Sequence, residues 1–182
     1  MSETARGFII IMVVGLVILA AAALADRRTR LRSTPGLVDS ELSGATSISL
    51  KLASASLATH DKQRSLARDA AVLVCDDPVE TVRELLPIWA ALPQWQWLVI
   101  AAPSFDQSVI DALNANLAAG TRQVQAVTGG VDARTQLAEL TGTTAQPRSE
   151  LQAGAVTATD LGHIKLSMAS PSGMHLVANS EP

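Results

Sequence analysis

Residues 7–25 form an uninterrupted apolar run, GFIIIMVVGLVILAAAALA, and this run constrains the structure more strongly than any other part of the sequence. As a helix rising about 1.5 Å per residue, it spans roughly 28 Å, close to the ~30 Å thickness of the hydrocarbon core of a bilayer. The sequence therefore predicts a single transmembrane helix within residues 1–26.

Basic residues follow the apolar run directly and predict its orientation. They are Arg27, Arg28, Arg30 and Arg32. The sequence before the run contributes one arginine, which Glu3 offsets. Because positively charged flanks remain in the cytoplasm, we expect a single-pass membrane protein with its N-terminus outside and its C-terminal part in the cytoplasm. The alternative is a cleaved secretory signal, since Ala23-Leu24-Ala25 resembles a small-x-small cleavage site. The nearly uncharged region before the run and the arginines after it favour the anchor.

Composition limits what the rest of the chain can do. A length of 182 residues suffices for one domain in addition to the anchor. A net charge of −3 provides no overall positive field for nucleic acid, and the absence of tyrosine argues against a surface on which bases stack. The single cysteine excludes an internal disulfide and a metal site built from cysteines.

The pattern of apolar and turn residues predicts a juxtamembrane linker over residues 27–46 and one domain over residues 47–182. Strands are expected over residues 47–58, 70–75, 95–102, 121–127 and 163–169, and residues 174–178 are expected to pair with the last of these as a hairpin. Helices are expected from Asp77 to about Leu92, from Ser104 to Gly120 and from Asp132 to Gly142. This alternation of strands and helices predicts an α/β domain.

Candidate catalytic groups do not form a recognised constellation. The sequence lacks a phosphate-binding glycine loop, a dinucleotide fingerprint and a Gly-x-Ser-x-Gly elbow. His163 and His175 are expected to face each other across the final hairpin as a surface pair, without a third metal ligand nearby. Cys75 ends an apolar strand and is interpreted as a small buried hydrophobe, and Asp77 is interpreted as the N-cap of the helix that starts at Pro78. We therefore expect no enzyme activity, no cofactor and no metal.

Several segments in register resemble the group I chaperonin (GroEL) family. They are VLVCDDPVETVRELLPIWAALPQWQWLVIA, LNANLAAG, VQAVTGGVDARTQLAELTGT and VTATDLGHIKLSM, and they cover about residues 70–177. In that family these segments belong to the apical domain. The resemblance therefore implies a chaperonin apical-like (swivelling β/α) domain, without the ATP-binding and hinge domains and so without ATPase activity.

The resemblance also implies a partner-binding groove between two helices. Its positions in this sequence are Leu86, Trp89, Ile110, Asn114 and Ala115. Val82 and Leu85, which share a helical stripe with Leu86 and Trp89, are interpreted as core. The family's upstream aromatic cluster falls on residues 51–56, which contain no aromatic side chain, so a groove suited to one partner is expected rather than one for unfolded chains in general.

Two functions are compatible with these features. The first is a membrane-anchored, non-enzymatic module whose groove docks an apolar segment of a partner protein, either a membrane protein complex or a non-native polypeptide. The second is an accessory structural subunit that stabilises or caps the cytoplasmic face of a larger membrane complex. A fixed stoichiometry with one partner would distinguish the second from the first.

Overall fold

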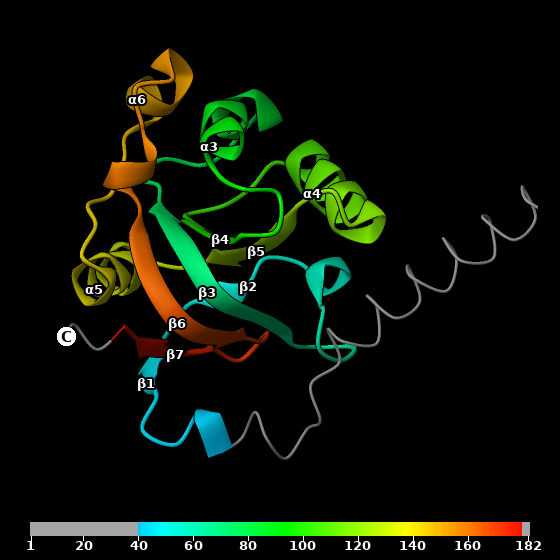
Figure 1. Cartoon of the computed structure of the whole chain (residues 1–182), viewed down its shortest axis with the longest axis vertical. Helices are drawn as coiled ribbons and strands as arrows, with labels where there is room; N and C mark the ends of the chain where they lie inside the picture. Colours follow the sequence, from blue (N-terminus) through cyan, green and yellow to red (C-terminus); the bar gives the residue numbers. More distant parts are fainter. Residues whose placement is uncertain (1–39, 180–182) are drawn as a thin grey trace, which may run out of the picture. The chain divides into compact units, whose positions relative to one another are not determined.

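The structure is a computed structural model that describes residues 40–179 (Figure 1). The predicted transmembrane helix, its flanking arginines and most of the predicted linker lie outside the described residues. Among residues 40–179, none of the helices has both the length and the hydropathy needed to cross a bilayer.

The described residues form a mixed α/β fold, as the alternation of strands and helices predicts. The strands are β1 (Thr46–Ile48), β2 (Lys51–Leu52), β3 (Ser65–Val74), β4 (Trp97–Ala102), β5 (Gln123–Thr128), β6 (Gly162–Ala169) and β7 (Met174–Ala178). The α-helices are α3 (Leu86–Ala91), α4 (Gln107–Ala119), α5 (Val131–Thr141) and α6 (Arg148–Ala153). Three 3-10 turns complete the domain: η1 (Ala55–Leu57), η2 (Val82–Leu85) and η3 (Ala158–Asp160).

The strands form one seven-stranded sheet in the order β1-β7-β6-β3-β4-β5-β2. Strands β3, β4 and β5 are parallel, and the remaining pairs are antiparallel. The outermost strands β1 and β2 are separated in sequence only by Ser49 and Leu50. Because the three residue steps from Ile48 to Lys51 span at most about 11 Å, the sheet must curl until its two edges approach each other. The N–H of Leu52 on β2 donates to the carbonyl of Ser170 at 2.9 Å, which links one edge strand to the turn between β6 and β7.

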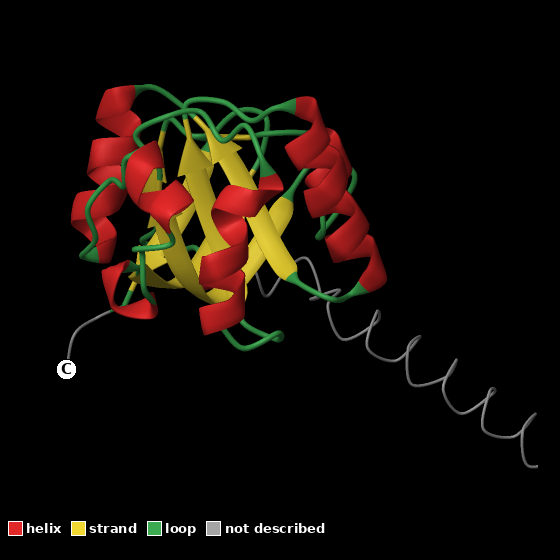
Figure 2. Ribbon diagram, turned by 90° about the horizontal axis from the view of Figure 1, so that it is seen from above, coloured by secondary structure: helices red, strands yellow, loops and turns green. Residues whose placement is uncertain are grey.

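The interior of the curled sheet contains a small hydrogen-bonded polar cluster among many apolar side chains. Gln125 on β5 donates to the carbonyl of Ser65 at 2.8 Å and accepts from the hydroxyl of Ser167 on β6. All three residues are fully buried. Buried amides and hydroxyls need such partners, so this triad ties β3, β5 and β6 together inside the domain. Figure 2 shows the helices arranged around the strands.

The structure corrects the predicted limits of the first central strand. β3 begins at Ser65, not at residue 70, because it pairs with β6 from the Ser65–Ala169 position onward. Residues 65–69 lie before the predicted strand, and pairing with a neighbouring strand stabilises them in extended form. The single strand expected over residues 47–58 is instead divided between β1, β2 and η1.

The structure also corrects the helix expected to begin at Asp77. Residues 78–80 are not helical, η2 follows at Val82, and the α-helix begins only at Leu86. Pro87 explains this start, because proline has no N–H to donate to the carbonyl four residues earlier and is tolerated only in the first turn. Asp77 accepts a hydrogen bond from the N–H of Arg148 at 2.9 Å, so it caps the start of α6, a helix that the pattern did not predict.

One further prediction was wrong in detail. His175 pairs with Met168 across the hairpin, and His163 pairs with Ala71 on β3, so the two histidines do not face each other. The turn over residues 170–173 sets this register by placing Ala169 opposite Met174.

Candidate functional site: the α3–α4 face

We call the surface formed by α3, α4 and the loop after α3 the α3–α4 face. The residues on this face or directly beneath it are Leu86, Trp89, Trp95, Ile110, Asn114 and Ala115. Five of them are the predicted groove positions, and Trp95 is added because the structure leaves it exposed.

The short helix α3 presents one side to the core and another to solvent. Leu85, Ile88 and Trp89 are buried, with exposed fractions of 0%, 1% and 6%. Leu86 is 52% exposed, and Trp95, four residues beyond the end of α3, is 75% exposed. The large apolar side chains at solvent therefore bracket α3, one at its first residue and one in the loop after it.

Helix α4 is held in place by caps at both ends. Asp106 accepts hydrogen bonds from the hydroxyl of Ser108 at 2.6 Å and from its N–H at 2.8 Å. These bonds favour the charged carboxylate and lower the pKa of Asp106 below its ordinary value. The cap was expected at Ser104 and lies at Asp106, whereas Gly120 ends the helix in the left-handed conformation (φ 68°) as predicted.

The structure connects α3 and α4 at both of their ends. Before the two helices, the N–H of Val79 donates to Ser104 at 3.1 Å, and the N–H of Asp106 donates back to Val79 at 3.0 Å. After them, the guanidinium of Arg122 donates to the carbonyl of Leu92, the residue that ends α3, at 3.1 Å. Figure 1 shows the two helices side by side.

The predicted groove residues differ in how much of their surface is available. Leu86 and Ala115 are exposed, and Asn114 is half-buried. Trp89 and Ile110 are almost completely buried in the core, at 6% and 5% exposed, so they lie behind the face and do not project from it. Their assignment to a groove stays a prediction.

Trp89 carries an unusual feature for a core residue. Its indole Nε1 is buried and has no hydrogen-bond partner among the described residues. An unpaired buried donor costs free energy, on the order of 1–3 kcal/mol. The sequence places three tryptophans close together at positions 89, 95 and 97, but periodicity does not indicate which of them is at solvent.

A charged cluster supports the face from the side of α6. Glu84 in η2 is 2% exposed, and its carboxylate accepts from Gln152 at 3.3 Å and from the N–H of Glu80 at 3.4 Å. Arg148 lies 4.0 Å from Glu84 and forms an ion pair with Glu80 at 3.0 Å. This cluster connects α6 to the turn that leads into α3, so it holds the start of α3 in place.

The remaining candidate groups do not assemble into a reactive site. Cys75 is buried, and this burial raises the pKa of its thiol to about 12. Asp76 and Asp77 are exposed. Within residues 40–179, no group of three or more histidine, cysteine, aspartate or glutamate residues is arranged to hold a metal ion.

Comparison with known proteins relates the fold to one class. A scan against protein-family models found no match, and a search of curated proteins found none either. Among solved structures, the chain is similar to the chaperonin gp146 from the bacteriophage EL 2 (Pseudomonas aeruginosa), crystallised in presence of ATP-BeFx in two forms. The TM-score is 0.56 for both forms, with 12% identity for one and 11% for the other.

The match covers 75% of this chain but only 29% and 28% of the two chaperonin chains. The chain therefore has a chaperonin-like fold and spans less than a third of the length of these chaperonins. At this level of identity the likeness concerns the fold alone.

Proposed function

We propose that this chain is a membrane-anchored, non-enzymatic protein-binding module with a chaperonin apical-like domain. In this proposal, the α3–α4 face docks an apolar segment of a partner protein, and the apolar run over residues 7–25 holds the domain at the cytoplasmic side of the membrane. The observation that carries the proposal is the exposure of Leu86 (52%), the first residue of α3, and of Trp95 (75%) in the loop after α3.

Exposed large apolar side chains are common anchors for protein partners, and tryptophan is enriched at the positions that contribute most to binding. Leu86 and Trp95 belong to one short segment, which the bonds from Val79 and Arg122 hold against α4. A rigid support of this kind lowers the entropy lost on docking, because the face is already in place before the partner arrives. No ATP or nucleic acid enters this proposal.

Site-specific photo-crosslinking in native membranes tests the proposal. A benzophenone amino acid replaces Leu86 in one variant and Val131 in a matched control, because Val131 is also apolar and exposed (67%) but lies on α5. We expect discrete crosslinked products from position 86 that are absent from position 131. The double variant L86S/W95S should abolish co-purification of the same partner. Identical products from both positions, or none from position 86, would contradict the proposal.

A second function is an accessory structural subunit of a membrane complex. The burial of Trp89 and Ile110 favours it, because these side chains leave less apolar surface between the helices than a groove for varied chains requires. A subunit of this kind would co-purify with one partner at fixed stoichiometry, and L86S/W95S would not change that stoichiometry.

A further inference from the structure

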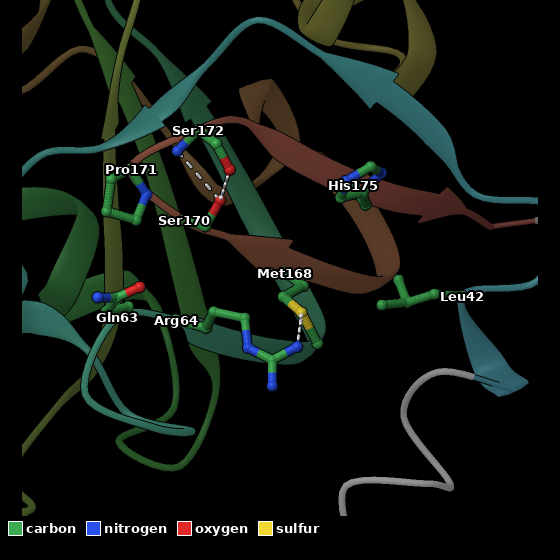
Figure 3. A pocket seen from close by; sticks show the side chains of 8 residues that line it. All are labelled: Leu42, Gln63, Arg64, Met168, Ser170, Pro171, Ser172 and His175. Atoms are coloured by element: carbon green, nitrogen blue, oxygen red, sulfur yellow. Dashed lines mark hydrogen bonds between the residues drawn. The ribbon is translucent and has the colours of Figure 1, made fainter.

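A hollow of about 570 Å³ lies at the end of the domain where the described chain begins (Figure 3). We call it the hairpin hollow, because the β6–β7 turn forms one wall of it. The residues used below are Leu42, Arg64, Met168, Ser170, Ser172 and His175. It adjoins the start of β3, whereas η2 follows the end of that strand, so the hairpin hollow is a site separate from the α3–α4 face.

The hairpin hollow combines hydrogen-bond donors with apolar side chains. The Nε of Arg64 is paired with Asp61 at 2.5 Å, and its Nη1 contacts the sulfur of Met168 at 3.6 Å. Within residues 40–179, Nη2 of Arg64 has no hydrogen-bond partner, and neither does the exposed imidazole of His175. The hydroxyls of Ser170 and Ser172 share a hydrogen bond of 2.9 Å.

A guanidinium, an imidazole and hydroxyl groups are donors that suit a phosphate oxygen. Figure 3 shows them together with Met168 and Leu42, two apolar side chains beside the polar ones. A ligand that has an anionic phosphate next to a hydrocarbon portion would satisfy both parts of the lining.

The charge distribution along the chain points to the same ligand. Nine of the 14 lysines and arginines precede residue 69, whereas 11 of the 17 acidic residues follow it. The segment before residue 40 includes the four arginines from Arg27 to Arg32 and joins the described domain two residues before Leu42. Basic groups within reach of a bilayer attract its anionic lipids.

We propose that the hairpin hollow binds the phosphate of an anionic phospholipid headgroup, with Arg64 and His175 on the phosphate oxygens and the half-buried Leu42 beside the glycerol. The bound lipid holds the domain against the membrane at the end where the chain enters it, which leaves the α3–α4 face turned toward the cytoplasm. This inference rests on the membrane anchoring in the proposed function but not on docking at the α3–α4 face.

The test uses the full chain in nanodiscs of phosphatidylcholine, with or without phosphatidylglycerol. Gln63, exposed at the rim of the hairpin hollow, is replaced by cysteine and labelled with an environment-sensitive fluorophore. Cys75 is fully buried and does not compete for the label. We expect a blue-shifted emission only with phosphatidylglycerol. Replacing one cation should lower the ratio of docked to undocked domains about fivefold, the effect of one basic side chain near an anionic surface.

Neutral substitutions distinguish lipid binding in the hairpin hollow from a general electrostatic attraction of the domain to the anionic bilayer. R64Q and H175Q should each reduce the shift, and together they should abolish it. R83Q removes an exposed arginine from η2 and should leave the shift unchanged. An equal loss with R83Q, or the same emission in both lipid mixtures, would overturn the proposal.

Soluble phosphate compounds test whether the hairpin hollow takes the phosphate of a lipid headgroup or a free phosphate in solution. Inorganic phosphate or glycerol 3-phosphate added to phosphatidylcholine nanodiscs should leave the emission unchanged, because these ligands lack the bilayer that brings the headgroup to the hollow. A shift with either would overturn the assignment to lipid. Carbonate extraction of membranes separately checks the anchor, and crosslinking from position 86 checks the α3–α4 face, so the proposals fail independently.

Discussion

Replacing Trp89 should show that its indole stabilises the core. A tryptophan buries roughly 200 Å², which at ~25 cal/mol per Å² contributes about 5 kcal/mol. The unpaired buried Nε1 offsets on the order of 1–3 kcal/mol of this. Trp89→Ala should therefore lower the free energy of unfolding by about 3 kcal/mol, the lower end of the usual range for this change.

Two companion variants separate the contributions to this value. Trp89→Phe keeps most of the buried area and removes the unpaired donor, so its free energy of unfolding should lie within about 1 kcal/mol of wild type. Leu86→Ala, at a side chain that is 52% exposed, should cost less than about 1 kcal/mol.

Urea unfolding of the full chain in detergent, followed by far-UV circular dichroism, measures all three changes. Circular dichroism is preferred to fluorescence because two of the variants remove a tryptophan. A cost for Trp89→Ala no greater than that for Leu86→Ala would refute the reasoning. The indole would then be at solvent, where a groove between α3 and α4 would use it directly.

Three further results are expected. A Cβ at Gly162 would lie 2.5 Å from Oγ1 of Thr141 and 2.7 Å from its carbonyl oxygen, so Gly162→Ala should cost about 1–3 kcal/mol in urea unfolding, whereas Gly130→Ala meets no atom within 4 Å and should be nearly neutral. Hydrogen bonds from the hydroxyl and N–H of Thr157 hold the pKa of Asp160 below its ordinary value of 3.8. The stability that this carboxylate contributes is therefore present at neutral pH and is lost as the pH falls below 3.8 and through the lowered pKa. Asp160→Asn should flatten the acid limb of a curve of unfolding free energy against pH. Cys75 should resist a thiol reagent at pH 8 in the native protein and react in denaturant, since burial raises the pKa of its thiol to about 12; rapid labelling of the folded chain would contradict its burial.

Local chemistry determined much of the fold in advance. Gly120 and Gly142 end α4 and α5 in the left-handed conformation, as their positions after apolar helical stripes predict. The apolar runs predict β4 and β5, and alternating residues with a turn at 170–173 predict the β6–β7 hairpin. These signals work because each depends on residues that are close together in the chain.

Other features depend on partners that are distant in sequence. β3 starts at Ser65 because β6, about a hundred residues later, supplies its hydrogen-bond partners. The curling of the sheet follows from the pairing of β1 with β7 and of β2 with β5. Asp77 has the sequence of a helix cap, but the N–H that it accepts from belongs to Arg148.

The candidate site also has some features that neighbouring residues in the chain predict and others that depend on distant parts of the chain. In this segment the sequence contains two overlapping stripes with the same helical spacing: Val82, Leu85, Leu86 and Trp89 in one, and Leu85, Ile88, Trp89 and Leu92 in the other. The sequence by itself determined that a helix here would have an apolar side, because both stripes satisfy the spacing. Only the tertiary structure decided that the second stripe is buried and that Leu86 remains at solvent. The physical reason is that burial depends on which neighbouring elements cover the helix, and a helix of six residues is too short for its own periodicity to select one side.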